Sequence, residues 1–152
     1  MYEGGIRVPM IAWWPGTVPA GATCELPCAF WDFMPTFAEM AGVACPQTDG
    51  ISILCALKGS YSAQTRHDYF YWKRAGEQVA RADDWKGIHT AKTGKLERYN
   101  LRTDPAEANE MGRAKPEVAQ RIQAILKETH MDDPRYPLIG KAKKAGNGDD
   151  EE

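Results

Sequence analysis

The stretch that decides the fold is residues 67–89, HDYFYWKRAGEQVARADDWKGIH. It contains three short segments rich in aromatic and β-branched residues, which are typical of strands. These segments are residues 67–72, 78–81 and 85–89. Asp83-Asp84 and residues 92–95 have the polar character of turns, Asn100-Leu101 continues the strand pattern, and Thr103-Asp104-Pro105 interrupts it. The stretch therefore predicts a small antiparallel β-meander.

A helix is predicted to begin at Pro116, after the meander. Apolar side chains recur there at helical spacing, and proline is well suited to the first helical position. The recurring residues are Val118, Ile122, Ile125, Leu126 and Thr129. We expect this helix to pack on one face of the meander as an α+β layer. Packed in this way, it should bury either Tyr69 and Tyr71 or Phe70 and Trp72, which favours a core role for these rings over a platform for sugar stacking.

Upstream of the meander, the sequence predicts one strand and one helix. Residues 6–14 are apolar almost without alternation and end at Pro15-Gly16, as in a strand covered on both faces within a larger sheet. Asp32 suits the N-cap of a helix that continues to Ala41, and Gly42 suits its C-cap. Three residues of this helix share one face that should lie against a core. They are Phe33, Phe37 and Met40.

Composition excludes several classes of protein. The chain has 152 residues, 43% hydrophobic and 26% charged, with a net charge of -2. This balance argues against a nucleic-acid-binding protein, which concentrates basic charge. The basic cluster at residues 141–144 is followed by the acidic residues 149–152, so residues 139–152 are expected to form a disordered tail. No secretory signal and no membrane span are recognisable in the sequence.

The cysteines and histidines show no metal-ligand spacing. Cys24, Cys28, Cys45 and Cys55 form no C-x-x-C pair, and buried or half-buried free thiols are the simpler expectation, with a disulfide left open. We expect His67 at a strand end or on the surface, and His130 beside the C-terminal dipole of the last helix. No serine lies in a nucleophile elbow.

Five segments, in this order, resemble the sulfatases of the formylglycine-dependent, alkaline-phosphatase-like superfamily. They are Tyr2-Glu3-Gly4-Gly5-Ile6-Arg7-Val8-Pro9 with Trp14-Pro15-Gly16, Asp32-Phe33-Met34-Pro35-Thr36-Phe37, Asp49-Gly50-Ile51-Ser52, Arg81-Ala82-Asp83-Asp84-Trp85-Lys86 and Tyr99-Asn100-Leu101-Arg102-Thr103-Asp104-Pro105-Ala106-Glu107. The resemblance is greatest to the arylsulfatase and N-acetylgalactosamine-6-sulfatase-like branch. It implies a C-terminal piece: residues 1–60 as the terminal strand and helix of the large α/β sheet, and residues 61–138 as the C-terminal subdomain.

The resemblance also implies which chemistry this chain lacks. The family uses a formylglycine made in a C/S-x-P-x-R motif, a calcium ion held by aspartates, and cationic groups that neutralise the sulfate. No cysteine here stands in that motif, and the active-site lysine of the family precedes the Glu-Gly-Gly segment. We therefore expect no catalytic residue and no metal ligand in this chain, with formylglycine and calcium supplied by the parent protein. The Asp83–Asp84 and Asp132–Asp133 pairs are interpreted as turns.

One residue is a candidate for the substrate pocket of the parent. His89 lies in a hairpin that approaches this pocket in related sulfatases, although a lone histidine is a weak signal. Lys73-Arg74 stand where relatives tend to carry an acidic residue, so they either influence substrate choice or form a solvated charge pair.

Two functions stay open from the sequence. The first is the C-terminal part of a sulfatase, inactive alone, whose partner is the N-terminal sulfatase half and whose parent binds sulfate esters but neither nucleic acid nor membrane. The second is a non-catalytic remnant or binding module that folds alone or complements a separate N-terminal half. A small hydrolase of another kind is a weaker third. The compartment is open, and export to the periplasm or outside is one option for the parent.

Overall fold

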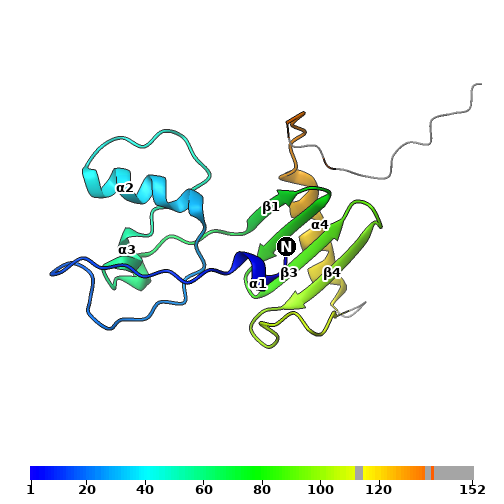
Figure 1. Cartoon of the computed structure of the whole chain (residues 1–152), viewed down its shortest axis with the longest axis horizontal. Coiled ribbons are helices and arrows are strands. Elements are labelled where there is room, and N and C mark those ends of the chain that lie inside the picture. Colours follow the sequence, from blue (N-terminus) through cyan, green and yellow to red (C-terminus); the bar gives the residue numbers. More distant parts are fainter. Residues whose placement is uncertain (112–114, 136–137, 139–152) are drawn as a thin grey trace, which may run out of the picture. The chain divides into compact units, whose positions relative to one another are not determined.

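The computed structural model describes residues 1–111, 115–135 and 138 (Figure 1), so the expected tail at 139–152 lies outside the described residues. The chain divides into two compact units. Unit 1 contains residues 1–8 and the chain from Asp68 onward, and unit 2 contains Pro9–His67. The boundary expected at residue 60 concerns the subdomains of the family that the sequence resembles. It stays a prediction.

Unit 1 is built on the meander that the sequence predicts. Its four strands are antiparallel in the order β1-β2-β3-β4, each paired with its neighbour in the chain. The strands are β1 Phe70–Arg74, β2 Glu77–Ala82, β3 Trp85–Thr90 and β4 Lys95–Asn100. Ala75 and Gly76 both have positive φ and join β1 to β2, as a tight hairpin turn requires. The α+β expectation for this part of the chain is confirmed.

Helix α4, Pro116–Glu128, covers one face of the sheet, also as predicted. Its apolar side chains meet small residues of β2, and Tyr71, Leu96 and Val118 pack around them. The buried residues of this cluster are Ala80, Ala82, Ile122, Ile125 and Leu126. The small side chains on the strands let the helix lie close to the sheet.

Gly87 is the point of closest approach between β3 and α4. A Cβ added there would lie 2.4 Å from Cγ2 of Ile122, whose side chain is itself buried. We expect Gly87→Ala to lower the free energy of unfolding by about 1–3 kcal/mol, because a packed core resists added volume. Urea unfolding measures this. In an Ile122→Leu background, which removes Cγ2, the same substitution should cost less, and an equal cost in both backgrounds would contradict the packing argument.

The opposite face of the sheet is covered by the start of the chain. Helix α1, Glu3–Ile6, belongs to this segment, and Met1 packs with Trp72 against a second core cluster. That cluster consists of Val79, Ile88, Tyr99 and Leu101. Figure 1 shows the N-terminus in front of the sheet and α4 behind it. Both faces of the sheet are therefore occupied.

The aromatic run of β1 is divided between these two faces. Tyr71 packs against the α4 cluster, whereas Trp72 packs on the N-terminal side and stacks on Phe70 with ring centroids 5.7 Å apart. The core role is confirmed for these three rings. Tyr69 is exposed, so the predicted pairing of Tyr69 with Tyr71 under the helix is wrong for Tyr69.

Unit 2 contains short helices joined by irregular segments. They are η1 Phe30–Asp32, α2 Phe33–Ala41, α3 Leu54–Leu57 and η2 Tyr61–Ala63. The predicted helix and its Gly42 C-cap are confirmed, with Gly42 at φ 65° in the left-handed region. The predicted inner face is wrong: Thr36 is the buried residue of α2, whereas Phe37 and Met40 are exposed.

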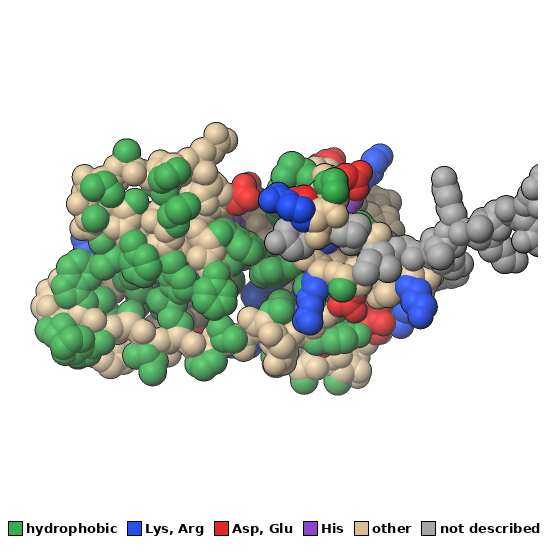
Figure 2. Space-filling view, turned by 45° about the horizontal axis from the view of Figure 1, so that its top comes forward, with side chains coloured by type: hydrophobic (Ala, Val, Ile, Leu, Met, Phe, Trp, Pro, Cys, Tyr) green, Lys and Arg blue, Asp and Glu red, His purple; other side chains and the backbone are tan. Residues whose placement is uncertain are grey.

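The predicted strand over residues 6–14 does not form. Glu3–Ile6 is helical, and residues 7–14 pair with no strand within the described part of the chain. A strand needs a hydrogen-bonded neighbour, and Pro9 has no backbone N–H to donate to one. Ile11 and Trp13 are 94% and 84% exposed, so the segment is apolar but uncovered. Figure 2 shows apolar side chains gathered over the part of the molecule that carries α2 and α3.

The cysteines are free thiols, as predicted, but not all of them are buried or half-buried. Cys28 and Cys55 are half-buried, whereas Cys24 and Cys45 are exposed. Desolvation, followed by the nearby charge of Asp32, raises the pKa of Cys28. A search for membrane spans over the described residues finds no helix with sufficient length and apolar character.

Candidate functional site

Lys86 is the most unusual residue of unit 1, because its side chain is a fully buried cation. It lies on β3 with 0% exposure, on the face that the start of the chain covers. Its Nζ lies 2.9 Å from Oε1 of Glu3 and 2.9 Å from Oε1 of Glu107. Both carboxylates belong to buried residues. A buried lysine needs such partners, since an isolated charge in the interior is very costly.

The two acidic partners are positioned by local structure at the start of the chain and in the segment between β4 and α4. Glu3 begins α1, and its backbone N–H donates a hydrogen bond to Oε2 of Glu107. Glu107 has φ 55°, in the left-handed region that most side chains avoid. The turn before it is held by Asp104, whose carboxylate accepts hydrogen bonds from the backbone of Ala108 and Asn109. The chain thus adopts an uncommon backbone conformation where Glu107 reaches Lys86.

The Glu3–Lys86–Glu107 cluster joins three of the five segments that resemble the sulfatases. The three residues come from residues 2–9, 81–86 and 99–107, which are far apart in sequence. The sequence interpretation did not identify this cluster. The available signal was Lys86 itself, a cation on the strand face that also carries Ile88.

A second polar cluster lies on the same face. Glu97 accepts hydrogen bonds from the Tyr2 hydroxyl at 2.6 Å, from Lys95 Nζ at 2.8 Å and from the Tyr99 hydroxyl at 2.9 Å. The hydrogen bond from Lys95, followed by that from Tyr2, lowers the pKa of Glu97 to about 2. The bond to Glu97 raises the pKa of Tyr2, and burial is the main cause that raises the pKa of Tyr99.

These contacts predict an acid-dependent contribution to stability. The pKa of Glu97 in the folded protein lies below its ordinary value of 4.5, so the carboxylate stabilises the fold above about pH 4.5 and loses this effect as the pH falls toward 2. We expect Glu97→Gln to be less stable than the wild type at pH 7, with the difference shrinking between pH 4.5 and 2. Urea midpoints of the two proteins across this range test it. A difference that is independent of pH would contradict the assignment.

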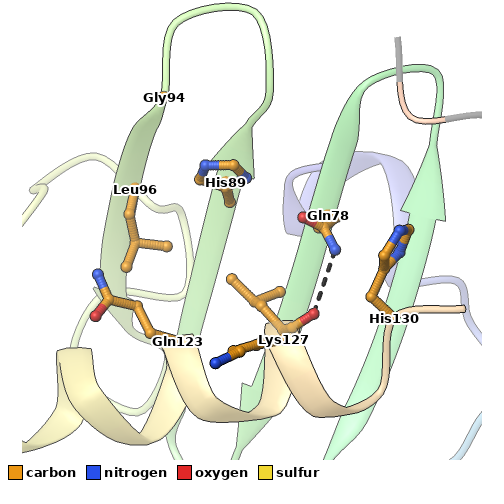
Figure 3. A pocket seen from close by; sticks show the side chains of 8 residues that line it. Gln78, His89, Gly94, Leu96, Gln123, Lys127 and His130 are labelled. Carbon is orange, nitrogen blue, oxygen red and sulfur yellow. Dashed lines mark hydrogen bonds between the residues drawn. The ribbon is translucent and has the colours of Figure 1, made fainter. Parts of the chain in front are cut away.

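His89, the candidate substrate-pocket residue, lines a pocket on the other face of the sheet, beside α4. The pocket has a volume of about 350 Å³. Its lining residues are Gln78, His89, Gly94, Leu96, Gln123, Leu126, Lys127 and His130. Figure 3 shows His89 and Gln78 on neighbouring strands, with Gln123 and Lys127 on α4. Gln78 donates hydrogen bonds to the Leu126 carbonyl and the Tyr71 hydroxyl, so it ties the sheet to the helix. The role of His89 in the substrate pocket of a parent enzyme stays a prediction.

His130 and Lys73 lie at the edge of this region. The ring of His130 lies 3.0 Å from a carboxylate oxygen of Asp132 and 3.4 Å from the Tyr71 hydroxyl. Lys73 Nζ donates to the Met131 carbonyl. The expected interaction of His130 with the dipole of α4 stays a prediction.

In unit 2, Asp32 is a buried carboxylate that holds several segments together. Its exposure is 0%, and it accepts hydrogen bonds from the backbone of Ala29 and Ile51 and lies 2.7 Å from Nε2 of His67. The predicted strand-end or surface position of His67 is wrong, because β1 begins three residues later and the His67 side chain is only 12% exposed. The hydrogen bond from Ile51 thereby joins two of the sulfatase-like segments, residues 32–37 and 49–52.

Thr36 and Gln64 complete this network. The Thr36 hydroxyl donates to the Asp32 carbonyl and accepts from the Ile53 N–H. The Gln64 side chain bonds the backbone of Ala56, Ser52 and Thr65. Gly50 lies against Trp31, where a Cβ would be 2.1 Å from the carbonyl oxygen. The network orders the backbone of these segments in unit 2.

Within the described part of the chain, the acidic pairs of the sequence do not form a calcium site. Asp83 pairs with Arg121 at 2.6 Å and Asp84 with Arg102 at 3.2 Å, and both aspartates lie in the turn between β2 and β3, as expected. Asp132 contacts His130, and Asp133 pairs with Arg135 at 2.8 Å. Among the described residues, no group of three or more His, Cys, Asp or Glu side chains could hold a metal ion. The donor set present therefore does not fit calcium.

Comparison with known proteins identifies the family that these features resemble. The family described as "N-sulphoglucosamine sulphohydrolase, C-terminal" matches residues 1–133. Human arylsulfatase A is 32% identical over 100 residues, covering 64% of this chain and 18% of that protein. Dog (Canis lupus familiaris) N-acetylgalactosamine-6-sulfatase is 37% identical over 141 residues, covering 91% of this chain and 24% of that protein. The chain thus spans about a quarter or less of the length of these two relatives.

Solved structures show the same fold. The crystal structure of Ps i-CgsB matches with a TM-score of 0.65 and 20% identity, covering 82% of this chain and 29% of that one. The 2-O GAG sulfatase BT1596 matches with a TM-score of 0.55 and 23% identity, covering 64% of this chain and 23% of that one. At these identities the likeness concerns the fold alone.

Proposed function

This chain belongs to the sulfatase family, as a C-terminal sulfatase domain, and from this premise we propose that it is the C-terminal part of an enzyme that hydrolyses sulfate esters. In that enzyme it closes one side of the substrate pocket and shapes substrate choice. It supplies no nucleophile and no calcium ligand, so the isolated chain has no turnover.

One observation carries the proposal, namely the cluster formed by Glu3, Lys86 and Glu107. Its two contacts to Lys86 Nζ, both at 2.9 Å, bring three sulfatase-like segments to one buried point. Matching residues in a sequence can share a pattern without sharing a structure. Here the segments that resemble the family are the ones that the fold joins, which supports a common role for them.

The chemistry is assigned to the upstream half of the parent protein. The Cys24 segment has its proline one place too late for C/S-x-P-x-R and lacks the arginine, and the segments at Cys45 and Cys55 do not fit either. The acidic pairs are engaged by arginines and a histidine or lie in turns. Formylglycine and calcium therefore belong to the proposed parent and not to this chain.

The proposed partner is the N-terminal sulfatase half, whether covalently joined or separate. Unit 2 exposes large apolar side chains, among them Ile11, Trp13 and Phe37 at 94%, 84% and 60%. Exposed apolar side chains in this number favour a surface that another protein segment covers. A strand partner from the N-terminal half would also give residues 6–14 the neighbour that a strand requires.

A second function is a non-catalytic module, and one observation favours it. Unit 1 has a core on both faces of its sheet, so it contains the parts of a self-contained domain. A monodisperse monomer of the whole chain in solution would favour this alternative. Aggregation that is relieved by a co-expressed N-terminal sulfatase half would favour the severed fragment.

Turnover by the purified chain is the direct test. We expect no hydrolysis of an aryl sulfate such as 4-methylumbelliferyl sulfate, with or without calcium, because the sequence has no C/S-x-P-x-R motif from which the formylglycine nucleophile is made. Release of the fluorescent phenol is the measurement. Calcium-dependent turnover that survives purification to homogeneity would overturn the inactivity of the chain.

Sequencing about a kilobase of the source DNA upstream of Met1 tests the parent. An in-frame C/S-x-P-x-R motif, an early Asp-Asp pair and a lysine just before Tyr2 would support an ordinary sulfatase. A stop codon directly upstream, with a ribosome-binding site, would favour the non-catalytic module over the sulfatase part.

A further inference from the structure

We infer that Lys86 is a positioning residue of the parent sulfatase: the buried Glu3–Lys86–Glu107 cluster fixes how the upstream half meets the C-terminal sheet. The inference rests on the proposed function, and it goes beyond it by assigning the coupling to one buried cation. Lys86 touches no reacting atom in this assignment. It acts through the segment that it holds.

The cluster contains a residue of the short N-terminal segment that docks on the sheet. Only residues 1–8 of the N-terminal region belong to unit 1, and the chain leaves that unit at Pro9. In the parent, the upstream half is therefore covalently joined to the C-terminal sheet through these residues. Glu3 is their buried acidic residue, and both its carboxylate and its backbone N–H are bound within the cluster.

The cluster is suited to setting position more than to adding stability. A buried ion pair often contributes no more stability than apolar residues of the same volume, but it accepts few alternative arrangements. A shift of Glu3 by one residue along the sheet would leave Lys86 or Glu107 without its partner. Apolar contacts such as those of Met1 with the second core cluster tolerate such shifts better.

The backbone of Glu107 supports the same positioning role. Its φ of 55° is unfavourable for a residue with a side chain, and such conformations persist where the surrounding structure fixes them. The contacts that fix this one are the Glu107 carboxylate with Lys86 and with the Glu3 N–H. Geometry maintained in this way is a common property of positions that have to be exact within a site.

The experiment compares two lysines in the full-length parent and in this chain. Lys86→Met removes the buried cation, and Lys73→Met is the matched control, since Lys73 lies on the other face and donates to a backbone carbonyl at an exposed site. Hydrogen exchange is read at the N–H groups of Glu3, Ile6 and Arg7, which are hydrogen-bonded in the docked segment. Steady-state kinetics on an aryl sulfate are measured well below the unfolding midpoint of each variant.

We expect Lys86→Met to expose these N–H groups to exchange while those of β2 and β3 stay protected. In the parent, KM should rise and kcat/KM should fall on the order of 100-fold, as a displacement of about 1 Å can cause. Lys73→Met should leave the exchange of the Glu3, Ile6 and Arg7 N–H groups unchanged, because Lys73 lies on the other face of the sheet. If Lys86→Met fails to fold, Glu107→Gln, which keeps the cation and Glu3, is expected to show the same changes to a smaller degree.

Each outcome decides between the two claims. An unchanged KM, with kcat reduced only in proportion to the folded fraction, would overturn the positioning role and leave the proposed function standing. Retained protection of Glu3, Ile6 and Arg7 in a folded variant would overturn it as well. A wild-type parent without sulfatase activity would overturn the proposed function itself, and the inference with it.

Discussion

Replacing Lys86 with methionine is expected to lower the free energy of unfolding of unit 1 by about 3–5 kcal/mol. The substitution leaves Glu3 and Glu107 as buried carboxylates without their cation, and the methionine side chain offers no donor. Urea unfolding at pH 7, followed by circular dichroism, measures the loss. The matched variant Lys73→Met should change stability by no more than about 0.5 kcal/mol, because it removes an exposed contact.

A triple variant separates the cost of unpaired charge from the value of the intact cluster. Glu3→Gln, Lys86→Met and Glu107→Gln together remove all three charges, so no buried ion is left without a partner. We expect the triple variant to recover a large part of the stability that Lys86→Met loses. A triple variant that is as unstable as the single one would show that the cluster itself stabilises the fold strongly.

Replacing Asp32 with asparagine is expected to destabilise unit 2 by about 2–4 kcal/mol. The asparagine side chain keeps one acceptor oxygen, whereas the carboxylate of Asp32 accepts from Ala29, Ile51 and His67. Its new amide N–H groups would face these donors inside a site with 0% exposure. The Ile51 N–H should therefore exchange faster with solvent, and the urea midpoint of unit 2 should fall.

The control for Asp32 is Asp49→Asn, in the neighbouring sulfatase-like segment. Asp49 is exposed, so the same chemical change should have a small effect on both measurements. Equal effects of the two substitutions would contradict the role assigned to the buried carboxylate.

The meander and α4 were predictable from the sequence because each carries its own periodic signal. Alternation and turn residues identify the strands, and the spacing of Ile122, Ile125 and Leu126 identifies the helix and its inner face. Both signals are local. The structure confirms them for these elements.

The incorrect predictions for residues 6–14 and for the inner face of α2 share a physical cause, which is that both depended on a partner. An apolar run such as residues 6–14 can be covered or uncovered, and its composition is the same in both cases. The exposure of Phe37 and Met40 has the same origin, since an apolar helix face indicates a contact but not which element makes it.

The polar clusters could not be predicted from local pattern at all. Lys86 and Glu3 are 83 residues apart, and Asp32 and His67 are 35 residues apart. The family resemblance marked the segments of Glu3, Lys86 and Glu107 as related to a known protein, but it did not say that they meet. Sequence spacing predicts helix faces and strand alternation, and it says little about contacts over such distances.

Synthesis from the N-terminus separates residues 1–8, the first segment of unit 1, in time from the residues that they contact. The Glu3 N–H finds its acceptor on Glu107, 104 residues later in the sequence. At a synthesis rate of about 5–20 residues per second, roughly 5–20 seconds separate the two on the ribosome. Residues 9–67 can fold during that interval, whereas residues 1–8 remain unattached. Docking of the first segment onto the sheet is therefore expected among the last events of folding, and chaperones and proteases have access to the first segment until it occurs.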